Sequence, residues 1–248
     1  MKVLKDLGAV SFDLGEAEAA AAYLNAALVW ANEIGDLSGL SAIYNGLAYT
    51  YRARGDLDAA AGYLQRALGA TEAANDLVQA AMVRNSLAVL SADRGHLQSA
   101  VAHADRAIEI ARVTGPAAYL ASTLNTKAEC LLKLEDLSGA EQWAAEALRL
   151  ATEHSASGAA ASVAGAAARL VLAEIAARLG AVDQSKHQLE EAAATYRTTG
   201  AKQELGEVLM RLSQLAQANG DDAAAQRFAA EAFRSTQSAS HLLERRVT

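Results

Sequence analysis

The chain has 248 residues and a formal net charge of −7, and it contains 62 alanines, one proline and one cysteine. Because β-strands need many branched and aromatic residues with frequent turn signals, an aromatic share of 5% argues against a sandwich or a barrel. The acidic balance argues against direct nucleic-acid binding and against adsorption to an anionic membrane surface. An all-helical protein is the class that remains.

Six similar segments follow one another along the chain, beginning with GEAEAAAAYLNAAL and GDLDAAAGYLQRAL. Their first residues are Gly15, Gly55, Gly95, Glu135, Gly180 and Gly220, at steps of 40 residues except for one step of 45. Before each segment, apolar or small residues recur at the spacing of one helix face, as in Tyr44, Leu47, Ala48 and Tyr51. Each repeat is therefore predicted to be two helices, here named helix A and helix B. They are joined by a tight turn at the segment's first residue, here called the turn residue.

The predicted repeats span approximately residues 1–35, 36–75, 76–115, 116–157, 158–200 and 201–240. Between repeats, glycine or asparagine suits a left-handed helix end, as at Gly35, Asn75, Gly115 and Gly200. Pro116 suits the first turn of the next helix. The longer step is expected to be absorbed between His154 and Gly158, in a longer loop or an extended helix that is the most mobile part of the chain. Residues 241–248 are expected to begin a further or capping helix.

The pattern L-G/A-x-x-Y followed by G-x-x-x-x-A-x-x-x-L/Y-x-x-A resembles the tetratricopeptide repeat (TPR), in the long form of bacterial regulators and kinesin-light-chain-like adaptors. The resemblance implies an all-α, right-handed α-α superhelical solenoid of about six helix pairs, whose concave groove binds a protein or peptide segment. Arg84, Lys127 and Arg169 depart from the pattern, since each stands where a large apolar residue is usual.

The two ends of the chain bear on its partners. Helix A of the first repeat lacks its first turn, and neither end carries a clear polar capping element of the kind that solenoids need. We therefore expect either an excised module of a larger protein or self-association through open solenoid ends. The alternative is a natural terminus with a short, frayed helix.

A second stripe of helix A lies at positions 13, 10, 6 and 3 before the turn residue. In tetratricopeptide repeat proteins, which this sequence resembles, the corresponding stripe lines the concave groove. Asparagine recurs there at a 40-residue period, and its amide can pair with a peptide backbone. Two interpretations remain open: a ladder that clamps a peptide, or a structural row that hydrogen-bonds to neighbouring repeats. The candidate peptide-binding residues are Lys5, Asn45, Tyr49, Arg52, Met82, Asn85, Asn125 and Glu129. Only Arg52 and Lys5 are expected to hold a ligand carboxylate.

Tyr23, Tyr63, His103 and Trp143 share one position in helix B, eight residues after the turn residue. They are expected to pack against the next repeat, and the alternative is a convex binding stripe.

No catalytic constellation, phosphate-binding loop or metal-ligand motif is present in the sequence, so we expect no enzyme activity, no cofactor and no metal. The single cysteine, Cys130, fits a reducing, cytoplasmic compartment. The sequence favours a protein- or peptide-binding scaffold that contacts neither nucleic acid nor membrane. The alternative is the sensor domain of a bacterial transcription regulator, and an unrecognised enzyme is a remote third.

Overall fold

The computed structural model describes the backbone of residues 1–154 and 158–244, and the side chains up to residue 235 except that of Asp13. Twelve α-helices and no strand are found among these residues, so the all-helical prediction is confirmed. The chain divides into two compact units, Met1–Gly115 and Pro116–Thr248. The first holds α1 (Lys2–Asp13), α2 (Ala17–Ile34), α3 (Leu37–Ala53), α4 (Leu57–Ala74), α5 (Leu77–Asp93) and α6 (Leu97–Thr114). The second holds α7 (Ala117–Lys133), α8 (Leu137–Glu153), α9 (Ala159–Arg178), α10 (Val182–Thr199), α11 (Lys202–Ala218) and α12 (Asp222–Glu244).

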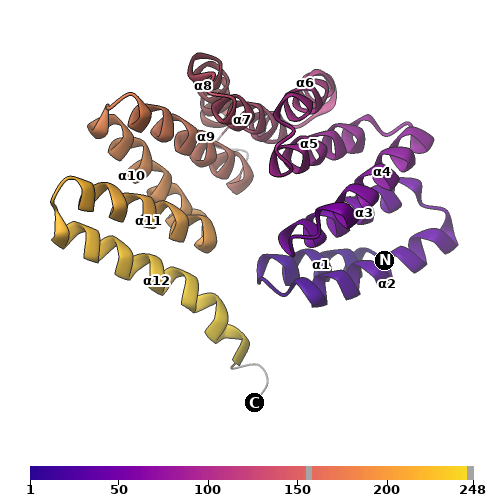
Figure 1. Ribbon diagram of the computed structural model, residues 1–248. Coiled ribbons are helices and arrows are strands. Elements are labelled where there is room, and N and C mark those ends of the chain that lie inside the picture. Colours follow the sequence, from indigo (N-terminus) through magenta and orange to yellow (C-terminus); the bar gives the residue numbers. More distant parts are fainter. Residues whose placement is uncertain (155–157, 245–248) are drawn as a thin grey trace. The chain divides into compact units, whose positions relative to one another are not determined.

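Consecutive helices pack as pairs, α1 with α2 through α11 with α12, and within each unit every pair packs on the next (Figure 1). This is the arrangement of a repeat solenoid, in which each unit contacts its neighbours along the chain. The apolar face of each helix A and the small residues of each helix B meet in the core. Ala27, Ala67, Ala107 and Ala147 are all fully buried, which lets the helix backbones approach closely.

Each turn residue within a pair has a left-handed backbone. The glycines have φ between 74° and 81°, and Glu135 adopts the same region with φ 65°. This geometry lets the next backbone N–H donate to a carbonyl five residues back, as from Asp56 N to Tyr51 O at 3.0 Å. An aspartate then caps helix B in several pairs, and the Asp56 carboxylate accepts from the Ala59 N–H at 3.0 Å.

The link at Gly115 differs from the other links between pairs. Gly35, Asn75 and Gly200 are left-handed as predicted, but Gly115 is extended, with φ −92° and ψ 154°. The reason is Pro116, which disfavours helical geometry in the residue before it. Pro116 also lacks the N–H that Asp36 donates to the Ala31 carbonyl at 3.1 Å in the first link. Pro116 occupies the N-cap rather than the first turn of α7, and the division into two units falls at this link.

Two residues of the row eight positions after each turn, Tyr63 and Trp143, contact helix A of their own pair. Tyr63 also packs against a core that includes Val83 of the next repeat. The Tyr63 ring stacks on Tyr51 with centroids 5.2 Å apart. The Lys127 ammonium lies 3.8 Å from the centroid of the Trp143 ring. These contacts explain departures from the repeat pattern, because a cation in helix A finds a partner in helix B: Arg169 likewise donates to Gln188 Oε1 at 2.9 Å.

Two length irregularities were expected from the sequence. Helix α9 has 20 residues where α7 has 17, so three of the five extra residues lengthen this helix. Part of the expected mobile segment, residues 155–157, lies outside the described residues. The expected further helix at 241–248 is not separate: residues 241–244 continue α12, because no glycine or proline interrupts the chain after Gly220. Residues 245–248 lie outside the described residues.

Helix α9 also stands out by its apolar composition. It is the one helix, within the part of the chain that the structure describes, whose length and mean hydropathy of 1.5 would suit a membrane span. Half of that stretch is buried in the protein, and the core helix of a soluble protein passes the same test. Its packing between α8 and α10 accounts for its composition.

Candidate functional site

The eight candidate residues, here called the helix-A stripe, are distributed over the first helices of four pairs. Lys5 lies on α1, Asn45, Tyr49 and Arg52 on α3, Met82 and Asn85 on α5, and Asn125 and Glu129 on α7. The spacing of positions 45, 49 and 52 places the three α3 residues on one helix face. The residues on α1, α3 and α5 belong to the first unit and those on α7 to the second, so the two groups are described separately.

Asn45 and Asn85 lie deep in the first unit. Each is only 7% exposed, and each side-chain amide oxygen is buried without a hydrogen-bond partner among the described residues. Leaving a buried acceptor unpaired costs about 1–3 kcal/mol, because the water lost on folding is not replaced. The two asparagines are therefore a local cost to folding, and their amide oxygens make no bond to a neighbouring repeat.

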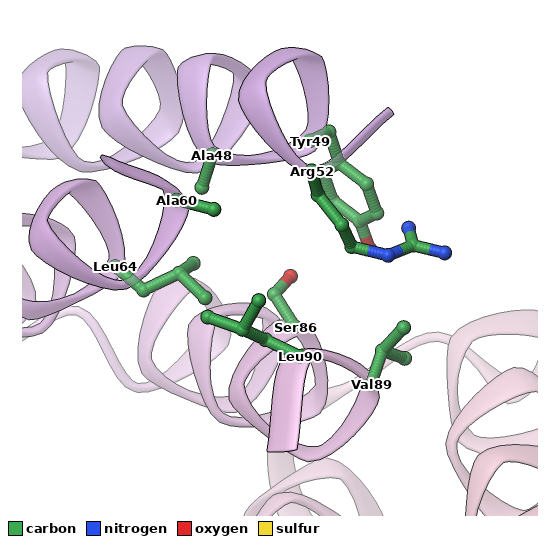
Figure 2. Close-up of a pocket in the computed structure, with 8 residues that line it drawn as sticks. All are labelled: Ala48, Tyr49, Arg52, Ala60, Leu64, Ser86, Val89 and Leu90. Atoms are coloured by element: carbon green, nitrogen blue, oxygen red, sulfur yellow. The ribbon is translucent and has the colours of Figure 1, made fainter. Parts of the chain in front are cut away.

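Tyr49 and Arg52 border a small cavity of about 10 Å³ between α3, α4 and α5, which Leu64 and Leu90 close from below (Figure 2). Arg52 lies along the ring of Tyr49, with 6.0 Å from its guanidinium carbon to the ring centroid (Figure 2). The Tyr49 ring in turn meets Phe12 edge-on, with centroids 6.5 Å apart.

Arg52 is already paired within the protein. Its Nε lies 2.6 Å from Asp93 Oδ2 at the end of α5, and both side chains are about one third exposed. This contact could not be predicted from the sequence, since Asp93 is 41 residues away and its position holds no regular residue type across the repeats. A ligand carboxylate must therefore compete with Asp93 for Arg52.

Lys5 and Met82 complete the stripe in the first unit. Both side chains are half-buried. Together with Tyr49, Met82 supplies the apolar surface beside the asparagines.

The second unit contributes one joined pair. The Asn125 amide donates from Nδ2 to Glu129 Oε1 at 2.9 Å, one helical turn further along α7. Asn125 is 5% exposed, and its oxygen is also buried without a hydrogen-bond partner among the described residues. The amide oxygens of the three asparagines at the 40-residue period are thus alike, since each is buried without a hydrogen-bond partner among the described residues.

The same position in the last two repeats is apolar, with Leu170 on α9 and Met210 on α11. Met210 borders a groove of about 750 Å³ between α11 and α12, with Gln214 and Phe233 on its walls. The repeat pattern places Met210 at the same helix position as the asparagines. It did not predict the groove, because Phe233 comes from the other helix of the pair.

Potential metal ligands are scattered over the described side chains. No group of three or more His, Cys, Asp or Glu residues among them is placed to hold a metal ion. Cys130 is buried in α7, where it packs as a small apolar residue.

Comparisons with known proteins agree with this architecture. Residues 1–73 match one family model described as tetratricopeptide repeat, and residues 80–115 match a second with the same description. No curated protein matches the chain.

Solved structures of similar fold cover most of the chain. The crystal structure of BtubC (BKLC) from P. vanneervenii is 19% identical with a TM-score of 0.67, over 88% of this chain and 90% of that one. The apo form of RapI is 12% identical with a TM-score of 0.74, over 95% and 82%. A Rap protein complexed with Competence and Sporulation Factor is 15% identical with a TM-score of 0.66, over 96% and 75%. The matched models show tetratricopeptide repeats in residues 1–73 and 80–115, and the likeness to these solved structures shows that the same kind of fold extends over most of the chain.

Proposed function

We propose that this protein is a non-enzymatic scaffold that binds a segment of another protein, or a peptide, along the helix-A stripe. The observation that carries the proposal is the set of buried amide oxygens at Asn45, Asn85 and Asn125, which have no hydrogen-bond partner among the described residues. A fold that keeps three such costs at one period gains something else from them. Pairing with the backbone of an extended ligand is the gain that an amide offers best.

The proposed binding mode assigns a role to each residue of the stripe. Turning an asparagine amide about its Cβ–Cγ bond exchanges the places of oxygen and nitrogen at little steric cost. Asn45 and Asn85 can therefore present either a donor or an acceptor to a peptide bond. Tyr49 and Met82 offer apolar contact, and Lys5 and Arg52 hold an acidic group, with Arg52 released from Asp93. In the second unit, Asn125 and Glu129 offer a separate polar contact.

One structural neighbour was solved with a bound factor, which supports a peptide or protein segment as the class of ligand. The Rap protein in that comparison is complexed with Competence and Sporulation Factor, and the fold likeness covers 96% of this chain. We propose a cytoplasmic protein whose groove takes such a factor, either as a free-standing adaptor or as the sensing module of a larger regulator.

The test uses a phage-displayed library of random peptides selected on the wild-type chain. Selected peptides are then titrated by calorimetry against an Asn45→Ala/Asn85→Ala variant. Each lost hydrogen bond is worth about 1 kcal/mol, or roughly a fivefold weaker Kd, so the double variant should bind at least tenfold more weakly.

The matched control is Asn25→Ala/Asn32→Ala, which removes the same chemistry from α2. Those two amides donate to backbone carbonyls of their own helix, at 2.9 Å each. The control should bind as tightly as wild type. If the stripe variant, with unchanged helicity and Tm, binds the selected peptides as tightly as the control does, the stripe is not the binding site.

A further inference from the structure

Helix A of each later pair presents one apolar face to the pair before it. The face, here called the docking face, consists of the residues 12, 8 and 5 positions before the turn residue. In α3 these are Ile43, Leu47 and Thr50, all fully buried, and Ile43 and Leu47 share a core with Leu24 of α2. In α5, Val83 and Leu90 pack in the same way on Leu64 of α4.

Helix α1 carries an apolar docking face that no described residue covers. Its members are Val3, Leu7 and Val10, at the same three positions. Val3 is 69% exposed and Val10 is 54% exposed, whereas their counterparts in α3 and α5 are buried. Isolated exposed apolar residues are ordinary, but three in the register of a recurring interface form a contact surface.

The groove between α11 and α12 is the complementary half of the same interface. Gln214, Ala229 and Ala232 on its walls correspond in register to Tyr49, Leu64 and Ala67, where α5 packs across α3 and α4. Met210 in the groove is 47% exposed, although its counterpart Asn45 is almost fully buried.

Charge is complementary as well. Inside the chain, neighbouring helices A place residues of nearly the same repeat position side by side. Arg52 and Asp93 show this, because they form an ion pair and lie three and two positions before their turn residues. At equal register, Lys2 of α1 would meet Glu207 of α11, and Asp6 would meet Arg211. All four side chains are exposed. Each pair joins opposite charges.

We propose that the docking face of α1 in one copy of this chain packs into the α11–α12 groove of a second copy. The contact repeats the interface that the chain already forms between its own pairs. Because the face and the groove are different surfaces, the contact is heterologous, and copies add head to tail into a ring or an open row.

The experiment is sedimentation velocity over a concentration series with variants that block one half of the interface each. Val3→Glu/Val10→Glu places charge on the docking face, and Met210→Glu places charge in the groove. Wild type should exceed the mass of one chain, 25.8 kDa, increasingly with concentration, while each variant alone stays at that mass. A mixture of the two variants should form a complex of one copy of each, since one keeps its groove and the other its docking face.

Val113→Glu is the matched control, because Val113 is highly exposed on α6 outside both surfaces, and it should associate like wild type. A charge reversal avoids any doubt about folding: Asp6→Arg should weaken association, and mixing it with Arg211→Asp should restore it. A wild type that stays at 25.8 kDa at every concentration would overturn the proposal. So would a Met210→Glu variant that still associates with itself, which would indicate contact between like surfaces.

Discussion

At the scale of single residues, each asparagine at the 40-residue period destabilises the fold and also offers an amide to a bound ligand. An unpaired buried oxygen is tolerated in a native protein when function requires it, and its removal then stabilises the fold. The sequence predicted the period and the residue type. It could not predict that the amide oxygens of Asn45, Asn85 and Asn125 would be buried without a partner among the described residues, because burial depends on helices that pack from elsewhere in the chain.

We expect Asn45→Leu to raise the free energy of unfolding by about 1–2 kcal/mol, because it removes an unpaired acceptor and keeps the branched shape. Leu170 already occupies the equivalent position in α9. Urea denaturation would measure the change. If Asn45 instead holds neighbouring repeats together through its amide, the substitution would lower stability by a similar amount.

Glu135 is the one turn residue that is not glycine, yet it adopts the same left-handed backbone, with φ 65°. A side chain in that conformation costs about 1–2 kcal/mol. The exposed ion pair between Glu135 and Arg178, at 3.5 Å, contributes little stability. Glu135→Gly should therefore raise the free energy of unfolding by about 1 kcal/mol and Tm by roughly 2–4 °C.

The reverse exchange at an equivalent turn provides the control. Gly95 has φ 77°, and apart from Gly95 and its two chain neighbours no described residue has an atom within 4 Å of where its Cβ would be, so Gly95→Glu tests the backbone alone. It should lower Tm by a comparable amount. Equal Tm values for all three proteins would show that this turn geometry carries no measurable cost.

At the scale of helices, the caps and turns were predictable and the partners of unusual residues were not. Glycine, asparagine and aspartate favour particular backbone conformations at their own positions, so most helix ends could be predicted from where these residues occur. Lys127 and Arg169 looked like defects in the pattern, since each partner, Trp143 or Gln188, lies on the other helix of the pair. The prediction of a left-handed backbone at Gly115 was wrong, because the effect of the following proline outweighed the preference of glycine for a left-handed helix end.

Asp76 joins two pairs and gives the fold a dependence on pH. Its carboxylate accepts from the Gln79 N–H at 3.0 Å and from the Ser38 hydroxyl at 2.5 Å, and these bonds lower its pKa below the usual value. The stabilisation is fully present above the unfolded-state pKa of about 4 and is lost as the pH falls through the lowered native pKa. Asp76→Asn keeps a capping side chain but removes the titration.

We expect Asp76→Asn to be less stable than wild type at pH 7, with a difference that shrinks as the pH falls below about 4. Urea denaturation at a series of pH values would measure it. Ser38→Ala removes one of the two donors and should give a smaller pH-dependent difference of the same sign. A deficit for Asp76→Asn that is independent of pH would show that the charge of Asp76 contributes nothing.

At the scale of the whole molecule, the repeat period predicted six helix pairs but not the division of the chain into two compact units. The division coincides with one link, where an extended glycine and a proline without an N–H replace the hydrogen-bonded turn found at Gly35. A repeat pattern describes what the repeats have in common, so it does not mark the one link that differs from the others.

Because solenoid contacts join neighbours along the chain, a core cavity in one unit should destabilise mainly that unit. Leu47 of α3 and Leu209 of α11 are both fully buried, and Leu→Ala at such a site costs about 2–5 kcal/mol. In hydrogen exchange read by mass spectrometry, Leu47→Ala should speed exchange in α1 to α6 and leave α7 to α12 close to wild type. Leu209→Ala should give the mirror result, so that each variant serves as the control for the other. If either substitution speeds exchange equally in all twelve helices, the chain opens as one cooperative body, and a ligand held on the stripe of the first unit would stabilise the second unit just as strongly.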